Sequence, residues 1–246
     1  MPLGLLCLSV DLLCSGVGGL ESGVSCSASS QGASGHALQA VESESQLYIE
    51  GMTPLMISCF RGDRKRVEQL LQAGGSVDAR DSLGRTAIWY ARSGDIISLL
   101  VKYGASMNAR DTSGATPLID AASRRELDTV KGLLANGADP DARDGHGRTA
   151  LMLAARERLY LQQPSGKAVA RELLVAGADP NQQDKEGVTA LMLAAESGQT
   201  DLMRMLLESG AKPNLKDHKG RSVVEYATRG GHRKAAILLR DWPQAK

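Results

Sequence analysis

The chain has 246 residues, with 29 Lys and Arg against 28 Asp and Glu, and therefore a formal net charge of +1. This balance excludes a strongly basic nucleic-acid binder and an acidic tail protein, and a hydrophobic content of 42% is typical of a soluble globular protein. The charge is divided unevenly, however: residues 1–60 hold five acids and no base, a net of −5, and residues 61–246 therefore carry +6.

The first 46 residues predict a flexible leader. They are rich in Ser and Gly and have little periodic apolar content, so they bury too little surface to fold alone. The apolar run at residues 1–10 is short, ends at Asp11 and has no basic flank, which argues against a signal peptide. We therefore expect a cytoplasmic protein, or also a nuclear one if the source is eukaryotic. Secretion or periplasmic export is the alternative if the N-terminus is a signal peptide.

Cysteine usage and hydropathy support this expectation. The cysteines are Cys7, Cys14, Cys26 and Cys59. They show no CxxC spacing, which does not fit a disulfide framework and favours a reducing compartment. No segment reaches the roughly 18 uninterrupted apolar residues that suggest a membrane span.

From about residue 50 the sequence repeats itself. Each unit opens with a hydroxyl residue, in order Thr53, Thr86, Thr116, Thr149, Thr189 and Ser222. The spacings are 33, 30, 33, 40 and 33 residues, a period that predicts stacked supersecondary units, each too small to bury its own apolar surface. We therefore predict a repeat domain over residues 47–242 and a short tail over 243–246.

The third unit shows the predicted anatomy of a repeat. Thr116 has the residue type of a helix N-cap, and Pro117 suits the first helical position. A second helix carrying Val130 and Leu133 is predicted to end at Gly137, where glycine supplies the left-handed backbone. An extended turn follows over residues 138–147.

These units closely resemble the ankyrin repeat over about residues 50–242. The matching segments are TPLMISC (53–59), TPLIDAA (116–122), TALMLAA (149–155 and 189–195), LLANGADPDARD (133–144), LLVAGADPNQQD (173–184) and LLESGAKPNLKD (206–217). The resemblance implies an all-α repeat fold, an ankyrin-type solenoid of paired antiparallel helices with projecting β-hairpin loops and a concave face. It also implies a protein-binding role.

The polar residues favour no catalytic or metal site. One aspartate recurs at the start of every turn, namely Asp81, Asp111, Asp144, Asp184 and Asp217. This recurrence indicates a structural role, in which Asp accepts hydrogen bonds from the backbone that follows it. No histidine has partners at zinc-site spacing, and no phosphate-binding glycine loop is present. We therefore expect no catalytic residue, cofactor or metal, and a protein that is not an enzyme.

The arginines are the candidate partner-binding residues. The resemblance implies that partner contacts come from the hairpin tips and the ends of the first helices. Arginines near these helix ends are Arg61, Arg92, Arg124, Arg156 and Arg229, and those just before an opening residue are Arg85, Arg148 and Arg221. Arginine pairs bidentately with carboxylates, so we expect an acidic protein segment as the ligand. Solvated surface arginines are an equally ordinary explanation.

The predicted function is a non-enzymatic interaction module or adaptor for a partner protein. A regulatory inhibitor subunit that masks a partner's site is the alternative. An enzyme, or binding to nucleic acid, is less favoured, because the chain lacks a converging titratable cluster and stacking aromatics. We expect no membrane and no small-molecule substrate.

Three irregularities interrupt the repeats. The second unit is three residues short, and we expect Trp89 and Tyr90 to fill a local distortion. The fourth unit gains seven residues near Tyr160, as an inserted loop that surface positions tolerate. Phe60, the single Phe, either closes the N-terminal end of the stack, which we favour, or is an exposed anchor.

Overall fold

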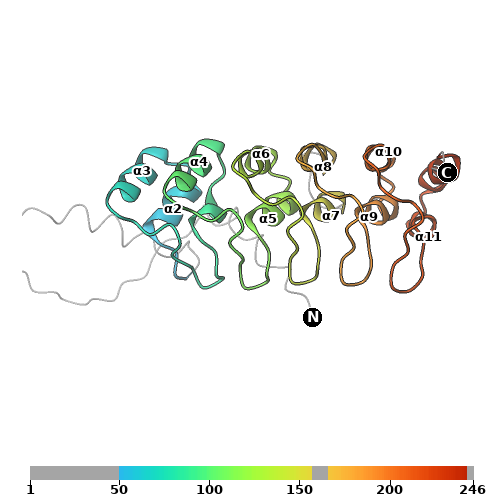
Figure 1. The fold of residues 1–246 in the computed structure, drawn as a ribbon, viewed down its shortest axis with the longest axis horizontal. Helices are drawn as coiled ribbons and strands as arrows, with labels where there is room; N and C mark the ends of the chain where they lie inside the picture. The colour runs from blue at the N-terminus through green and yellow to red at the C-terminus, as the bar shows by residue number, and fades with distance from the viewer. Residues whose placement is uncertain (1–49, 157–165, 243–246) are drawn as a thin grey trace, which may run out of the picture. The chain divides into compact units, whose positions relative to one another are not determined.

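The structure is a computed structural model that describes residues 50–156 and 166–242 (Figure 1). The predicted leader over residues 1–46, the inserted segment near Tyr160 and the predicted tail over 243–246 lie outside the described residues. The description below concerns the repeat domain alone.

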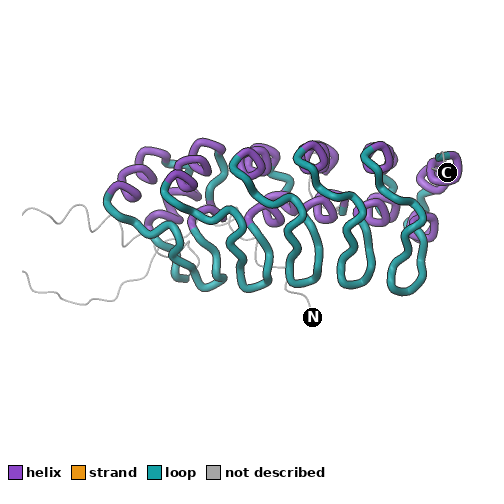
Figure 2. Tube along the Cα trace, in the orientation of Figure 1, coloured by secondary structure: helices purple, strands orange, loops and turns teal. Residues whose placement is uncertain are grey.

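The repeat domain consists of helix pairs that stack in one row (Figure 1). The first helices of the pairs, called inner helices here, are α2 (Pro54–Arg61), the 3₁₀ helix η1 (Ala87–Tyr90), α5 (Pro117–Arg124), α7 (Ala150–Ala155), α9 (Ala190–Glu196) and α11 (Val223–Arg229). The second, outer helices are α3 (Arg64–Gln72), α4 (Gly94–Lys102), α6 (Leu127–Ala135), α8 (Gly166–Val175), α10 (Thr200–Glu208) and α12 (Arg233–Asp241). Long loops project from the inner-helix side (Figure 2). The predicted fold class is confirmed.

A continuous apolar core runs through both helix layers. Inner helices contact inner helices, as α5 contacts α7, and outer helices contact outer helices, as α6 contacts α8. Leu118 and Leu151 of the inner layer and Leu133 and Leu173 of the outer layer are each at most 1% exposed. Buried alanine pairs in α5, α7 and α9 have small side chains that let the helices approach closely. Each unit therefore depends on its neighbours for burial, as expected for a solenoid.

Five of the six opening residues, all but Thr86, cap their inner helices through the side chain. The hydroxyl oxygens of Thr116 and Thr149 accept hydrogen bonds from the backbone N–H three residues later, at 3.4 Å in both cases. Pro117 occupies the first turn of α5, where its missing N–H has no cost. Gly137 follows α6 with a φ of 85°, which is the left-handed conformation predicted for it.

Each projecting loop is closed by its own aspartate. The Oδ1 atom of Asp144 accepts hydrogen bonds from the backbone N–H of His146 at 2.8 Å and of Arg148 at 2.9 Å. The same pair of bonds recurs at Asp81, Asp111, Asp184 and Asp217. The predicted structural role of these aspartates is confirmed.

Backbone hydrogen bonds join neighbouring loops without forming strands. The N–H of Gly145 donates to the carbonyl of Ser113, and the N–H of Lys185 donates to that of His146, at 2.9 and 3.0 Å. Within residues 50–156 and 166–242, the pairing of Lys216 with Ser222 is the one isolated β-bridge and there is no strand. The loops are therefore hairpin-shaped turns rather than β-ribbons.

A row of side chains, the hairpin ladder, also links the loops. Arg110 Nη1 donates to the carbonyl of Gly114 in its own loop, at 2.6 Å, and to the carbonyl of Arg143 in the next loop. The same pair of bonds is made by Arg80, Arg143 and Gln183. These residues hold the loops in register along the row, a role that sequence reasoning missed.

The second unit is distorted where its sequence is short, as predicted. Its inner helix is reduced to the single 3₁₀ turn η1, and Thr86 makes no side-chain cap bond. Trp89 and Tyr90 are 4% and 8% exposed, so their rings fill the space that a longer helix would occupy. The Tyr90 hydroxyl donates to Asp81 Oδ2 and ties η1 to its own loop.

Arg125 carries backbone strain at the end of α5. Its φ is 60°, and within the described residues it is the one non-glycine residue with a positive φ. The corresponding residues of other units are Gly62, Gly198 and Gly231. Arg125 Nη2 donates to the carbonyl of Arg156 in the next unit, at 3.2 Å. This bond compensates in part for a conformation that disfavours a Cβ atom.

We expect the Arg125→Gly variant to raise the free energy of unfolding by about 1 kcal/mol, because glycine adopts this conformation without the Cβ clash. The Gly137→Ala variant, at a φ of 85° with open space around it, should lower the same quantity by about 1 kcal/mol. Urea unfolding of both variants measures the two effects. A loss of stability in Arg125→Gly would show that the bond to Arg156 outweighs the strain.

Candidate functional site

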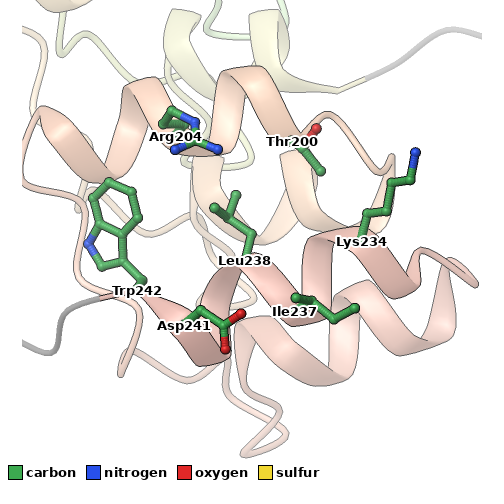
Figure 3. Close-up of a pocket in the computed structure, with 7 residues that line it drawn as sticks. All are labelled: Thr200, Arg204, Lys234, Ile237, Leu238, Asp241 and Trp242. Atoms are coloured by element: carbon green, nitrogen blue, oxygen red, sulfur yellow. The ribbon is translucent and has the colours of Figure 1, made fainter.

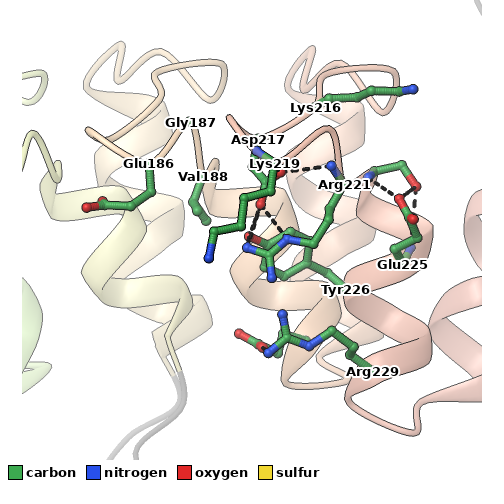
Figure 4. Close-up of polar contacts among 12 residues, drawn as sticks. Glu186, Gly187, Val188, Lys216, Asp217, Lys219, Arg221, Glu225, Tyr226 and Arg229 are labelled. Carbon is green, nitrogen blue, oxygen red and sulfur yellow. Dashed lines mark hydrogen bonds and ion pairs between the residues drawn. The ribbon is translucent and has the colours of Figure 1, made fainter.

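Two of the predicted partner-binding arginines are engaged within their own loops. Arg148 Nε and Nη2 both lie 2.8 Å from Asp144 Oδ2. Arg221 repeats the arrangement at 2.7 and 2.6 Å from Asp217 Oδ2 (Figure 4). Each guanidinium thus already pairs through two nitrogens with one carboxylate oxygen, and its charge is engaged within the loop rather than reserved for a partner.

Among the acids of the described residues, the Asp217 carboxylate is the most heavily bonded. Figure 4 shows Arg221 and Tyr226 converging on it, and the Tyr226 hydroxyl donates to Oδ2 at 2.8 Å. Burial alone would raise the pKa of Asp217, but the hydrogen bonds from Arg221 and Tyr226 outweigh it and hold that pKa well below its usual range. Burial and the bond to Asp217 raise the pKa of Tyr226 to about 12.

This depressed pKa predicts a stability that depends on pH. Unfolded Asp titrates near pH 4, so the stabilisation by Asp217 is fully present above about pH 4 and is lost as the pH falls toward the lower pKa of the folded state. The Asp217→Asn variant should therefore be less stable at neutral pH and lose less stability on acidification. Melting temperatures across this range measure the effect, and the exposed Asp78→Asn variant serves as the control. Equal acid sensitivity of wild type and Asp217→Asn would contradict the assignment.

Arg85 differs from its two counterparts because the second unit is distorted. Its guanidinium lies 5.2 Å from the centre of the Trp89 ring, and its Nε lies 3.9 Å from Asp111 of the next unit. Arg85 Nε and Trp89 Nε1 are buried and have no hydrogen-bond acceptor in the described part of the chain. Arg85 therefore packs against the inner helix instead of closing its own loop.

The arginines at the ends of the inner helices are placed in two ways. Arg124 is held by the carboxylates of Asp120, at 2.7 Å, and Glu126, at 3.3 Å. Arg229 lies 4.0 Å from Glu196 and remains 58% exposed at its side chain. Arg61, Arg92 and Arg156 are exposed as well, whereas Arg124 is partly buried.

Phe60 is exposed beside two of these arginines. Its side chain is 44% exposed at the end of α2, and the Arg92 guanidinium of the second unit lies 4.7 Å from the ring centre. The favoured prediction, that Phe60 closes the N-terminal end of the stack, is wrong, because the ring is exposed and the Arg92 guanidinium of the next unit lies over it. We call Phe60, Arg61 and Arg92 the aromatic–arginine corner.

A row of half-buried residues runs along the inner helices. Ile57, Leu153 and Leu193 occupy the fifth position of their units, counting the opening residue as the first, and each is partly exposed. Asp120 takes this position in the third unit. Burial raises its pKa, and the Arg124 cation opposes the rise. Sequence reasoning missed this acid, although its place at a position that is aliphatic in three units and Tyr in the other two was a visible signal.

The chemistry of the described residues offers no metal centre. No group of three or more His, Cys, Asp or Glu side chains within residues 50–156 and 166–242 is placed to hold a metal ion. In the same ranges no helix has the length and apolar character needed to cross a membrane. Burial raises the pKa of the Cys59 thiol to about 12, so this group stays protonated and is a poor nucleophile at neutral pH.

Two known proteins are similar in sequence to short parts of this chain. Tyrosine-protein kinase HTK16 of Hydra vulgaris is 36% identical over 92 residues, which are 35% of this chain and 12% of that protein. Protein LHCP TRANSLOCATION DEFECT of Arabidopsis thaliana is 43% identical over 49 residues, which are 20% of this chain and 28% of that protein. The chain thus spans less than a third of either relative.

A family model described as "Ankyrin repeats (3 copies)" matches residues 27–111, 55–144, 92–163 and 160–245. The first match begins within the segment predicted as a leader. Ankyrin repeats are generally protein–protein interaction modules. With matches that together cover residues 27–245 and helix pairs stacked as that family requires, the chain belongs to the ankyrin repeat family.

Proposed function

We propose that this protein is a non-enzymatic adaptor that binds an acidic segment of a partner protein on its inner-helix side. The observation that carries the proposal is the aromatic–arginine corner, where an exposed Phe60 lies under an exposed Arg92. The Phe60 ring is 44% exposed, and burying this apolar surface against an apolar side chain of a partner would be favourable. Such residues, together with arginine, dominate the binding energy of protein interfaces.

Preorganisation supports the same corner. Arg92 is stacked on Phe60, so both side chains have lost part of their freedom before a partner arrives. Binding there consequently costs less conformational entropy than binding to two independent side chains. Arg61 adjoins the ring in sequence and is exposed, so the corner pairs an apolar surface with positive charge. That combination fits a ligand with an apolar residue flanked by carboxylates.

The other predicted arginines contribute unequally to the proposed surface. Arg156 is exposed at the end of α7 and adds positive charge along the same side. Arg124 and Arg229 would exchange an existing carboxylate for that of the partner, so their net effect is smaller. Arg85, Arg148 and Arg221 already contact other residues of the repeat domain. We propose that they affect partner binding indirectly, by fixing the positions of the projecting loops.

Quantitative affinity capture tests the proposal. The full chain and its variants would be used as bait in a lysate of the cells that make it, with retained proteins identified and quantified. We expect Phe60→Ala and Arg92→Glu each to reduce capture of the specific partner by about tenfold or more, as expected for interface hot spots.

Matched changes on the outer helices serve as controls. Val175 is 80% exposed and Arg171 is exposed on the same helix, so Val175→Ala and Arg171→Glu remove similar chemistry from the opposite layer. Both should retain capture. If every specific partner binds the Phe60 and Arg92 variants as tightly as wild type, the inner-helix proposal fails.

A further inference from the structure

A second surface lies on the outer layer, between α10 and α12. A pocket of about 510 Å³ opens there, and three of its lining residues, Ile237, Leu238 and Trp242, are apolar; we call these three its floor. Ile237 is 40% exposed, and Leu238 and Trp242 are half-buried against the core (Figure 3). We call it the α10–α12 pocket. Its elements belong to the outer helices, whereas the aromatic–arginine corner is formed at the ends of inner helices.

The rim of the α10–α12 pocket is positively charged. Arg204 of α10 and Lys234 of α12 are both exposed and line the pocket together with the apolar floor (Figure 3). Asp241 also lines it, but Arg240 Nε lies 2.8 Å from its Oδ1 and Nη2 lies 3.4 Å from its Oδ2. The acid is therefore neutralised by a neighbour outside the lining, and the rim keeps two cations.

Two of the outer-helix junctions, α6 with α8 and α8 with α10, carry an ion pair, whereas within the described residues the α3–α4 and α4–α6 junctions carry none. Lys131 of α6 lies 3.7 Å from Glu172 of α8, and Lys167 of α8 lies 3.1 Å from Asp201 of α10. No ion pair joins α10 to α12 in the portion of the chain that the structure describes.

The sequence of α12 explains this difference. Asp201 is the second residue of α10, and the second residue of α12 is Lys234. Asp201, the acid through which α10 pairs with α8, is thus replaced by the base Lys234 in α12. Counted back from the glycine that follows each outer helix, Thr200 of α10 occupies the position that Lys167 occupies in α8. Among the described residues, the ion pairing that joins α6 to α8 and α8 to α10 is therefore absent between α10 and α12, and Arg204 and Lys234 line the pocket instead.

We propose that the α10–α12 pocket docks a short acidic segment of a second partner protein, with one apolar side chain on the floor and carboxylates beside Arg204 and Lys234. Charge complementarity selects this ligand, because two cations border an apolar floor whose one lining acid is already neutralised. The proposal does not depend on the aromatic–arginine corner. Two surfaces on different helix layers would let one chain hold two proteins at once.

Peptide binding to the full chain tests the proposal. The probes are fluorescein-labelled peptides, each with a Leu or Phe flanked by Glu and Asp, and matched peptides with Gln and Asn in place of the acids. Polarisation gives affinities, and the NMR signal of the Trp242 indole N–H reports on the pocket. We expect the acidic peptides to bind and to shift this signal, and the amide peptides to bind about tenfold or more weakly.

Charge reversal locates the binding site. The double variant Arg204→Glu with Lys234→Glu should lose about tenfold or more in affinity for the acidic peptides. The double variant Lys65→Glu with Lys102→Glu changes the net charge equally at exposed positions of α3 and α4 and should bind as wild type does. Circular dichroism melts of both variants check that the fold is kept.

Four outcomes would overturn the proposal. They are equal affinity for the amide peptides, no shift of the Trp242 signal by any peptide, equal losses in the two double variants, and loss of self-association rather than of peptide binding in the Arg204 and Lys234 variant. Phosphatidylserine vesicles serve as a further probe. Vesicle binding that depends on Arg204 and Lys234, without any peptide binding, would assign the pocket to a membrane surface instead.

Discussion

The Leu133→Ala variant is expected to lower the free energy of unfolding by about 3 kcal/mol. Leu133 is 0% exposed in α6, a helix that contacts α4 on one side and α8 on the other. Truncation leaves a cavity in the middle of the row, and a closely packed core relaxes only in part to fill it. The expected loss in the free energy of unfolding is therefore typical of a closely packed core, although the core of this domain contains few aromatic side chains.

Urea unfolding followed by circular dichroism measures this loss. The control is Val175→Ala, because Val175 is 80% exposed at the end of another outer helix and its truncation should change stability by less than about 0.5 kcal/mol. Similar small losses in both variants would contradict the description of α6 as a shared element of a continuous core.

The Asp144→Ala variant is expected to cost about 2–3 kcal/mol, and Asp184→Ala about 1–2 kcal/mol. Both aspartates accept two backbone N–H groups in their own loops. Asp144 also holds Arg148 through two contacts of 2.8 Å, whereas the residue at that position after Asp184 is Val188. The difference between the two losses therefore reflects the aspartate–arginine pair together with the deeper burial of Asp144.

A double-mutant cycle with Arg148→Ala makes the comparison quantitative. The loss from Asp144→Ala should shrink toward that of Asp184→Ala once Arg148 is absent, because no cation is then left without its carboxylate. The same free energies from urea unfolding provide the readout. Strict additivity of Asp144→Ala and Arg148→Ala would show that the pair is not coupled.

The regular part of the fold follows from local chemistry in the sequence. Thr116, Pro117 and Gly137 each dictate a backbone state at one end of a helix, and the structure has these states where they were expected. The stacking of units was equally predictable, since no single unit can bury its own apolar surface. The position of the distortion, in the second unit, was predicted. Its form as a 3₁₀ turn was not, because it depends on how Trp89 and Tyr90 pack, and the spacing of the repeats does not determine this packing.

The roles of the arginines were harder to predict. Arg148 and Arg221 follow an aspartate by four residues, a spacing that signals an internal pair, yet they were interpreted as free for a partner. Arg110 and Arg143 recur six residues before an opening Thr, and this recurrence should have indicated the hairpin ladder. A long side chain can contact its own loop, the next unit or solvent. Arg148 and Arg221 contact their own loops, and Arg110 and Arg143 also contact the next one.

The prediction for Phe60 was wrong in the opposite direction, because a residue expected to have a structural role is exposed. An aromatic residue in the first unit was expected to close the stack, but α2 ends so that its ring lies at the surface under Arg92. The partner of this ring comes from the next unit, 32 positions along the chain. Local patterns do not reveal such a contact.

Hydrogen exchange of the complex tests the central claim most directly. The full chain would be compared with and without a partner retained by affinity capture, with peptides covering the inner-helix ends and the projecting loops. Binding at the aromatic–arginine corner predicts slower exchange of the backbone amides at the end of α2 and in the segment after η1 that contains Arg92. Unchanged exchange in these two segments, with slowing confined to other parts of the chain, would contradict the account.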